Sequence, residues 1–180
     1  MALRRSVAGG PGRVLPAALA LALFLLCLPG EARALKEGDP FPHFTGQDLT
    51  GATVDTKTFA KKVILIEFWS IYCSSCVQQM PHVAALYDKY KDQGLQCIGI
   101  DMDVYGAARV KKFLDGLDFK IPYPNIIDAK MQIKTLLGVS ILPTTILVDT
   151  TGKVAMFHVG YKPGFEKELE EDVKKLLPGK

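Results

Sequence analysis

From residue 63 onward, hydrophobic positions follow two patterns that alternate along the chain. Two continuous apolar runs rich in β-branched residues, Val63–Trp69 and Leu95–Met102, have the length of strands that are covered on both faces. Each run is followed by a segment whose apolar residues recur at helical spacing, which predicts helices over Ser74–Gln93 and Ala107–Leu117. Upstream of these elements, Gly46–Thr53 is typical of a short hairpin.

The second half of the chain repeats this alternation with shorter elements. We expect a helix over Asp128–Gly138, because Asp128 can cap its first turn and Gly138 can end it. Ile141–Val148 and Val154–Val159 are expected strands, joined through Asp149–Gly152 as a hairpin turn. The final expected helix, Gly164–Leu177, opens with Glu and closes with Lys, which suits the helix dipole. Strands and helices in this order predict one layered α/β domain.

The first 34 residues have the pattern of an export signal. Three Arg precede an apolar run, Val14–Leu28, and Ala32–Ala34 places small residues where a signal peptidase acts. We expect cleavage after Ala34, which leaves residues 35–180 as the working domain. The apolar run has about 15 residues, whereas spanning a bilayer takes roughly 20. The alternative is an uncleaved membrane anchor.

Removal of this segment changes the charge and the cysteine count. The full chain has a formal net charge of +3, with 22 Lys and Arg against 19 Asp and Glu. Loss of four Arg and one Glu leaves 18 basic and 18 acidic residues, so the expected mature protein is neutral. A neutral domain without a basic patch gives no reason to expect a nucleic-acid partner. Three of the four Cys remain, in an extracytoplasmic compartment where disulfides persist.

The chemical signal is the pair Cys73 and Cys76, separated by two Ser at the start of a predicted helix. The free N–H groups and positive dipole at a helix start favour a thiolate, so Cys73 suits the role of attacking thiol. Cys76, one turn further into the helix, suits the role of resolving thiol. Zinc is one alternative, although structural zinc normally takes four ligands. A permanent structural disulfide is another, although so short a loop gains little stability from closure.

The sequence around this pair resembles the thioredoxin superfamily, and in particular the extracytoplasmic TlpA/ResA-like proteins with an N-terminal extension related to the AhpC/TSA peroxiredoxins. The matching segments are Glu37–Phe44, Val63–Cys76, Pro81 and Gly138–Asp149, and residues 101–125 resemble the insert of this subfamily. The resemblance implies a thioredoxin-like three-layer α/β fold. Its central mixed β-sheet is flanked by helices, with an N-terminal extension and a central insert.

The resemblance also implies a substrate-binding surface around the disulfide. Pro143 matches the cis-proline of the family, although a trans turn proline is the alternative from sequence. Leu142 would then present its backbone to an extended substrate segment as an added strand. Tyr72 stands where the family usually has Trp and would cover the site as an aromatic wall. The alternative is an ordinary surface aromatic residue.

Two positions depart from the subfamily pattern. Gln79 stands where these proteins often carry Glu, and Glu67 stands where they often carry Asn. Glu67 shares a strand face with Val63 and Leu65, and an acid among apolar neighbours has a raised pKa. We therefore expect Glu67 to be the general acid/base that deprotonates Cys76. The alternative is a Glu at a strand end that reaches water. Cys97, in an apolar strand, is expected to pack rather than to react.

The sequence thus predicts an exported, periplasmic thiol–disulfide oxidoreductase that uses Cys73 and Cys76, with neither metal nor cofactor. The resemblance implies a reductant of protein disulfides, with apocytochrome c thiols as one substrate class. It also implies a membrane thiol-transfer protein as electron donor and a monomeric state. A copper chaperone is an alternative, because two thiolates suit Cu(I), but the spacing of the Cys and the context of His158 differ from that group. A thiol peroxidase is a further alternative, but the chain lacks a lone peroxidatic Cys preceded by Thr and Pro.

Overall fold

A computed structural model describes residues 35–179 of the chain. The expected signal segment, with its apolar run Val14–Leu28 and the cleavage point after Ala34, lies outside the described residues. Within residues 35–179, no helix combines the length and the apolar character needed to cross a membrane.

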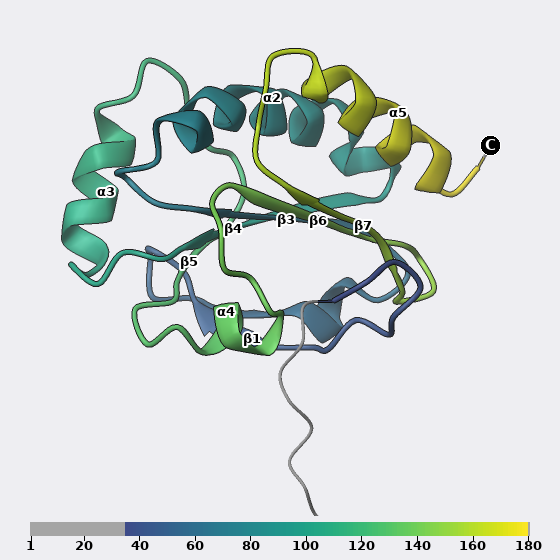
Figure 1. Ribbon diagram of the computed structural model, residues 1–180, viewed down its shortest axis with the longest axis horizontal. Coiled ribbons are helices and arrows are strands. Elements are labelled where there is room, and N and C mark those ends of the chain that lie inside the picture. The colour runs from purple at the N-terminus through teal and green to yellow at the C-terminus, as the bar shows by residue number, and fades with distance from the viewer. Residues whose placement is uncertain (1–34, 180) are drawn as a thin grey trace, which may run out of the picture. The chain divides into compact units, whose positions relative to one another are not determined.

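A five-stranded mixed sheet forms the centre of the domain (Figure 1). Its spatial order is β5-β4-β3-β6-β7, with β3 in the middle. β3 runs parallel to β4 and β4 parallel to β5, whereas β6 and β7 are antiparallel additions on the other side. The strands are β3 (Val63–Trp69), β4 (Leu95–Asp101), β5 (Asn125–Ile127), β6 (Thr144–Val148) and β7 (Val154–Val159).

Helices cover the sheet on both sides. The α2 helix (Ser74–Tyr90), which ends in a 3-10 turn at Lys91–Gln93, lies beside α5 (Phe165–Leu176) on one face (Figure 1). The insert helix α3 (Ala107–Asp115) packs on the same side, through Val110 and the side chains around it. The opposite face is covered by α4 and the N-terminal extension. These are α4 (Gln132–Leu136), the hairpin of β1 (Thr45–Gln47) and β2 (Thr53–Asp55), and the 3-10 turn Thr56–Phe59.

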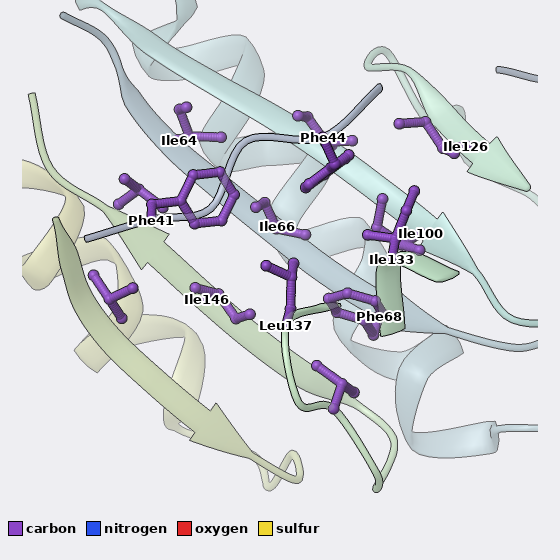
Figure 2. Close-up of a cluster of buried hydrophobic side chains, with 14 of the residues drawn as sticks. Phe41, Phe44, Ile64, Ile66, Phe68, Ile100, Ile126, Ile133, Leu137 and Ile146 are labelled. Atoms are coloured by element: carbon purple, nitrogen blue, oxygen red, sulfur yellow. The ribbon is translucent and has the colours of Figure 1, made fainter. Parts of the chain in front are cut away.

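Alternation along β3 explains why the sheet has two cores. Ile64, Ile66 and Phe68 point to the face covered by the N-terminal extension and α4. Figure 2 shows these side chains meeting Phe41 and Phe44 from the extension and Ile133 and Leu137 from α4. Val63 and Leu65 point to the other face, towards α2 and α5. Full burial of each such side chain stabilises the fold by roughly 1.5–3 kcal/mol, so both faces hold β3 in place.

The three-layer thioredoxin-like prediction is confirmed, two local expectations need correction, and one strand is additional. β6 begins at Thr144 rather than Ile141, because the residues before it form a turn around Pro143, which has no N–H for a strand ladder. The helix expected over Asp128–Gly138 spans only Gln132–Leu136. Asp128 still accepts the N–H groups of Gln132 and Lys134, both at 2.8 Å. β5 was not expected from the sequence, because three residues inside the insert are too few to show a period.

Candidate active site

Cys73 and Cys76 form a disulfide at the N-terminus of α2, with Cα atoms 5.2 Å apart. Cys73 is the N-cap residue, and its Sγ accepts the backbone N–H of Cys76 at 3.2 Å. The Ser75 hydroxyl oxygen lies 3.5 Å from the same sulfur. Cys73 is partly exposed, whereas Cys76 is only 1% exposed. In the reduced protein these donors and the helix dipole favour a thiolate at Cys73, which a substrate can reach.

A buried carboxylate holds the turn that leads into the disulfide. Asp103 accepts the Ser70 hydroxyl and the Ile71 N–H, both at 2.8 Å, and is itself 5% exposed. Its own N–H donates to Asp101, which is fully buried at the end of β4. Burial raises the pKa of Asp101 to about 8, and the neighbouring Asp103 adds to the rise.

Asp101 and Asp103 are not among the site residues expected from the sequence. The available signal was their position, because two acids directly follow a buried strand that pairs with β3. Trp69 and Asp101 are register partners, and this pairing brings the end of β4 beside the turn before Cys73.

Side chains from the insert pack over the buried half of the site. Trp69, Met80 and Val110 form a cluster with Cys76, and Phe113 of α3 stacks on the Trp69 ring. The Trp69 indole N–H donates to the Asn125 side chain at 3.0 Å. That amide occupies the space beside Gly99, where a Cβ would collide with it. The insert therefore does more than connect β4 to β5, because it excludes water from Cys76.

The turn before β6 lies against the same cluster. The Leu142–Pro143 peptide bond is cis, as the family resemblance implied. The Leu142 side chain packs against the cluster of Trp69 and Cys76. The Pro143 carbonyl accepts the N–H of Gly160 at 2.7 Å, whereas the N–H and C=O of Leu142 bind no other group within residues 35–179. This leaves the backbone N–H and C=O of Leu142 free for hydrogen bonding beside the disulfide.

Tyr72 lies at the exposed edge of the site. Its side chain is 63% exposed, and its ring meets Tyr105 edge to face with centroids 5.9 Å apart. Its hydroxyl accepts a hydrogen bond from the Arg109 guanidinium at 2.5 Å. Tyr72 therefore lies at the surface beside Cys73, and its ring and hydroxyl are held by Tyr105 and Arg109 of the insert.

Glu67 is buried in the layer between the sheet and α2. It is 2% exposed, so the alternative of a strand-end Glu in water is wrong. Its carboxylate accepts the Tyr123 hydroxyl at 2.5 Å. Burial raises the pKa of Glu67 from its ordinary value of 4.5 to about 7, against the smaller lowering by Tyr123. Glu67 can therefore gain or lose a proton near neutral pH. Sequence reasoning missed Tyr123, which lies 56 residues away along the chain.

Gln79 reaches the same buried layer from the helix. Its side-chain N–H donates to the Thr145 hydroxyl at 2.7 Å, and Thr145 is the cross-strand register partner of Glu67. The side-chain oxygen of Gln79 is buried without a hydrogen-bond partner in the described part of the chain. The helix position that often carries an acid in the subfamily thus contacts the strand next to Glu67.

Cys97 is a free, fully buried thiol on β4. Burial raises its pKa well above the ordinary value of 9.0, and the nearby Glu67 adds to the rise. The expectation that Cys97 packs in the core is confirmed. Among residues 35–179, no group of three or more His, Cys, Asp or Glu side chains is placed to hold a metal ion. The His158 ring stacks on Phe165, with centroids 3.9 Å apart.

Comparison with known proteins agrees with this geometry. Residues 37–157 match the AhpC/TSA family. The thiol-disulfide oxidoreductase ResA of Bacillus thuringiensis subsp. konkukian is 36% identical over 141 residues, which cover 78% of this chain and 79% of that protein. The ResA of Geobacillus thermodenitrificans is 30% identical over 147 residues, covering 82% of this chain and 79% of the relative.

A solved structure shows the same fold over the whole of its own chain. The putative thiol:disulfide interchange protein DsbE from Chlorobium tepidum superposes with a TM-score of 0.74 at 30% identity, and covers 79% of this chain and 99% of that one. Fold, disulfide and relatives together define a thiol–disulfide oxidoreductase of the thioredoxin-like class. The chain belongs to the AhpC/TSA family, on the match over residues 37–157 and its similarity to the ResA proteins.

Proposed function

We propose that this oxidoreductase works outside the cytoplasm as a monomeric reductant of protein disulfides. In this proposal residues 1–34 are the export signal and residues 35–180 are the working domain. The observation that carries the proposal is the asymmetry of the pair, with Cys73 partly exposed at a helix N-terminus and Cys76 buried one turn further on. That asymmetry separates an attacking thiol from a resolving thiol.

The first half-reaction joins the enzyme to its substrate. The Cys73 thiolate attacks one sulfur of a substrate disulfide, the substrate S–S bond breaks, and the other substrate sulfur leaves as a thiolate that takes up a proton. The substrate segment lies extended beside the turn at Leu142 and Pro143. Support comes from the unpaired N–H and C=O of Leu142, which can add a strand-like pair of hydrogen bonds. Tyr72 forms the aromatic wall on the exposed side.

The second half-reaction releases the substrate. Cys76 loses its proton to Glu67 and attacks the Cys73 sulfur, so the mixed disulfide breaks and the second substrate thiolate leaves. Two electrons have then passed from the enzyme dithiol to the substrate disulfide. Glu67 suits this proton transfer because its pKa of about 7 lies close to working pH. It shares a strand face with Trp69, which packs against Cys76.

A membrane thiol-transfer protein would return the two electrons to the oxidised enzyme. The resemblance to the TlpA/ResA-like proteins supports this donor, and supports apocytochrome c thiols as one substrate class. The neutral charge expected for residues 35–180 fits partners recognised by their sulfur chemistry rather than by charge alone.

The redox equilibrium of the purified protein with glutathione tests the direction of transfer. A reductant is expected to have a potential at or below the thioredoxin value of about −270 mV. A value near about −120 mV, typical of a strong oxidant, would overturn the reducing role. The fraction of oxidised protein is measured by thiol trapping across a series of glutathione ratios.

A further inference from the structure

Three exposed side chains from two parts of the chain meet beside the disulfide. Tyr72 directly precedes Cys73, Tyr105 lies in the loop after β4, and Arg109 lies in the first turn of α3. The Arg109 guanidinium lies 4.4 Å from the Tyr105 ring centroid and 5.6 Å from that of Tyr72. Two cation–π contacts and the hydrogen bond to the Tyr72 hydroxyl therefore fix the position of this side chain.

The fixed charge of Arg109 has no counter-ion within the part of the chain that the structure describes. Its guanidinium makes no ion pair with an Asp or Glu among residues 35–179, whereas Lys111 on the same helix pairs with Asp115 at 2.6 Å. The nearby carboxylate of Asp103 is directed inward to Ser70 and Ile71. A guanidinium carries five N–H donors, and the Tyr72 hydroxyl takes one of them.

We propose that Tyr72, Tyr105 and Arg109 form a recognition rim for a substrate segment that carries a carboxylate close to its reacting cysteine. The inference rests on the proposed function and names the substrate class of the same site. Arg binds a carboxylate through two parallel N–H donors, and here the side chain is already ordered before binding. The unpaired charge of Arg109 thus makes the rim select substrate segments that carry a carboxylate.

The dimensions of the rim set the position of that carboxylate. The length of the Tyr72 side chain separates the Arg109 guanidinium from the backbone next to Cys73. An extended substrate segment advances about 3.3 Å per residue. A substrate Asp or Glu roughly two to three residues from the reacting cysteine therefore reaches the guanidinium. Exposed apolar side chains at Val104 and Ile141, 64% and 58% exposed, add contact area for the rest of the segment.

The test uses disulfide-linked peptides that differ at one position, two residues from the cysteine, as Asp, Asn or Lys. We expect the wild-type protein to reduce the Asp peptide with a kcat/KM roughly three- to tenfold above that of the Lys peptide. Arg109→Gln should bring this ratio to about 1, and Arg109→Glu should invert it. Lys111→Gln removes the same charge from the same helix and should keep the wild-type ratio. Raising the ionic strength to about 1 M, where the Debye length is about 3 Å, should lower the ratio.

A small neutral disulfide, hydroxyethyl disulfide, separates failure of the rim from failure of the function. If the protein reduces this compound but reduces the three peptides at equal rates, the proposed recognition rim is wrong and the proposed function stands. A peptide ratio that survives Arg109→Gln, with all rates lowered together, would make Arg109 structural and overturn the rim as well. No reduction of either kind of substrate would overturn the proposed function itself.

Discussion

Cys73 and Cys76 are three residues apart, yet they belong to two different environments. The region around Cys73 lies at the surface, between the exposed side chains of Tyr72 and the insert and the half-buried Leu142. The region around Cys76 is a closed layer of Trp69, Met80 and Val110, next to the face that holds Glu67. In the proposed mechanism, one helix turn therefore separates substrate contact at Cys73 from proton transfer at Cys76, because α2 begins at the end of the central strand β3.

The largest expected effect separates the two thiols directly. Cys76→Ser leaves the attacking thiol in the exposed region and removes the resolving thiol from the closed layer. We expect multiple-turnover reduction to fall on the order of 1000-fold or more, because the mixed disulfide on Cys73 cannot resolve. Mass spectrometry should find substrate linked to Cys73. Cys73→Ser is the matched control and should form no such adduct, and an equal adduct in both variants would contradict the division of roles.

The next effect tests the proposed role of Glu67 as proton acceptor. Glu67→Gln keeps an acceptor for the Tyr123 hydroxyl but removes the ionisable group, so we expect turnover to fall about 100-fold. The pH dependence of the wild-type rate near pH 7 should disappear in the variant. An unchanged pH–rate profile from pH 5 to 9 would remove Glu67 from the mechanism.

The same variant also has a stability signature. The pKa of Glu67 is raised in the folded state to about 7, so the folded state loses stability as pH rises from about 4.5 through 7. Above pH 7 the ionised carboxylate costs on the order of 3 kcal/mol. Glu67→Gln should therefore be more stable than wild type at pH 8 and similar at pH 4, measured by urea unfolding. Equal stabilities at pH 8 would mean that Glu67 is not ionised in a buried site.

The smallest expected effect concerns the residue that holds Glu67. Tyr123→Phe removes the hydroxyl that lowers the pKa of Glu67, so the pH profile of turnover should move to higher pH. The lost hydrogen bond to a charged group should cost roughly 1.5–3 kcal/mol at pH 8. Tyr87→Phe is a matched control, because Tyr87 contacts the Tyr123 ring in the same cluster. A profile that shifts equally in both variants would assign the effect to packing.

The exposed and closed regions also differ in how far the sequence could predict them. The position of the Cys73–Cys76 pair at a helix start is predictable from local spacing. The position of the cis-proline Pro143 is predictable from the family motif just before a strand. Burial of Glu67 followed from its alternation with Val63 and Leu65 on one strand. These features need only a few neighbouring residues to be visible.

The features that sequence reasoning missed depend on contacts between distant segments. Tyr123 meets Glu67, and Asn125 meets Trp69, each across 56 residues, through the insert. Asp103 holds the turn before Cys73 from more than 30 residues away. Periodicity within one segment carries no information about such pairs, and the short β5 that positions Asn125 gives no period of its own.

The most direct test of the central claim is the alkylation rate of each thiol in the reduced protein. Purified protein is treated with limiting iodoacetamide between pH 5 and 9, and peptide mapping by mass spectrometry measures modification at Cys73 and Cys76 separately. We expect Cys73 to react at least about tenfold faster at pH 7, with a pKa below the ordinary thiol value of about 8.5. Equal rates at the two thiols, or faster reaction at Cys76, would contradict the division into an exposed attacking thiol and a buried resolving thiol.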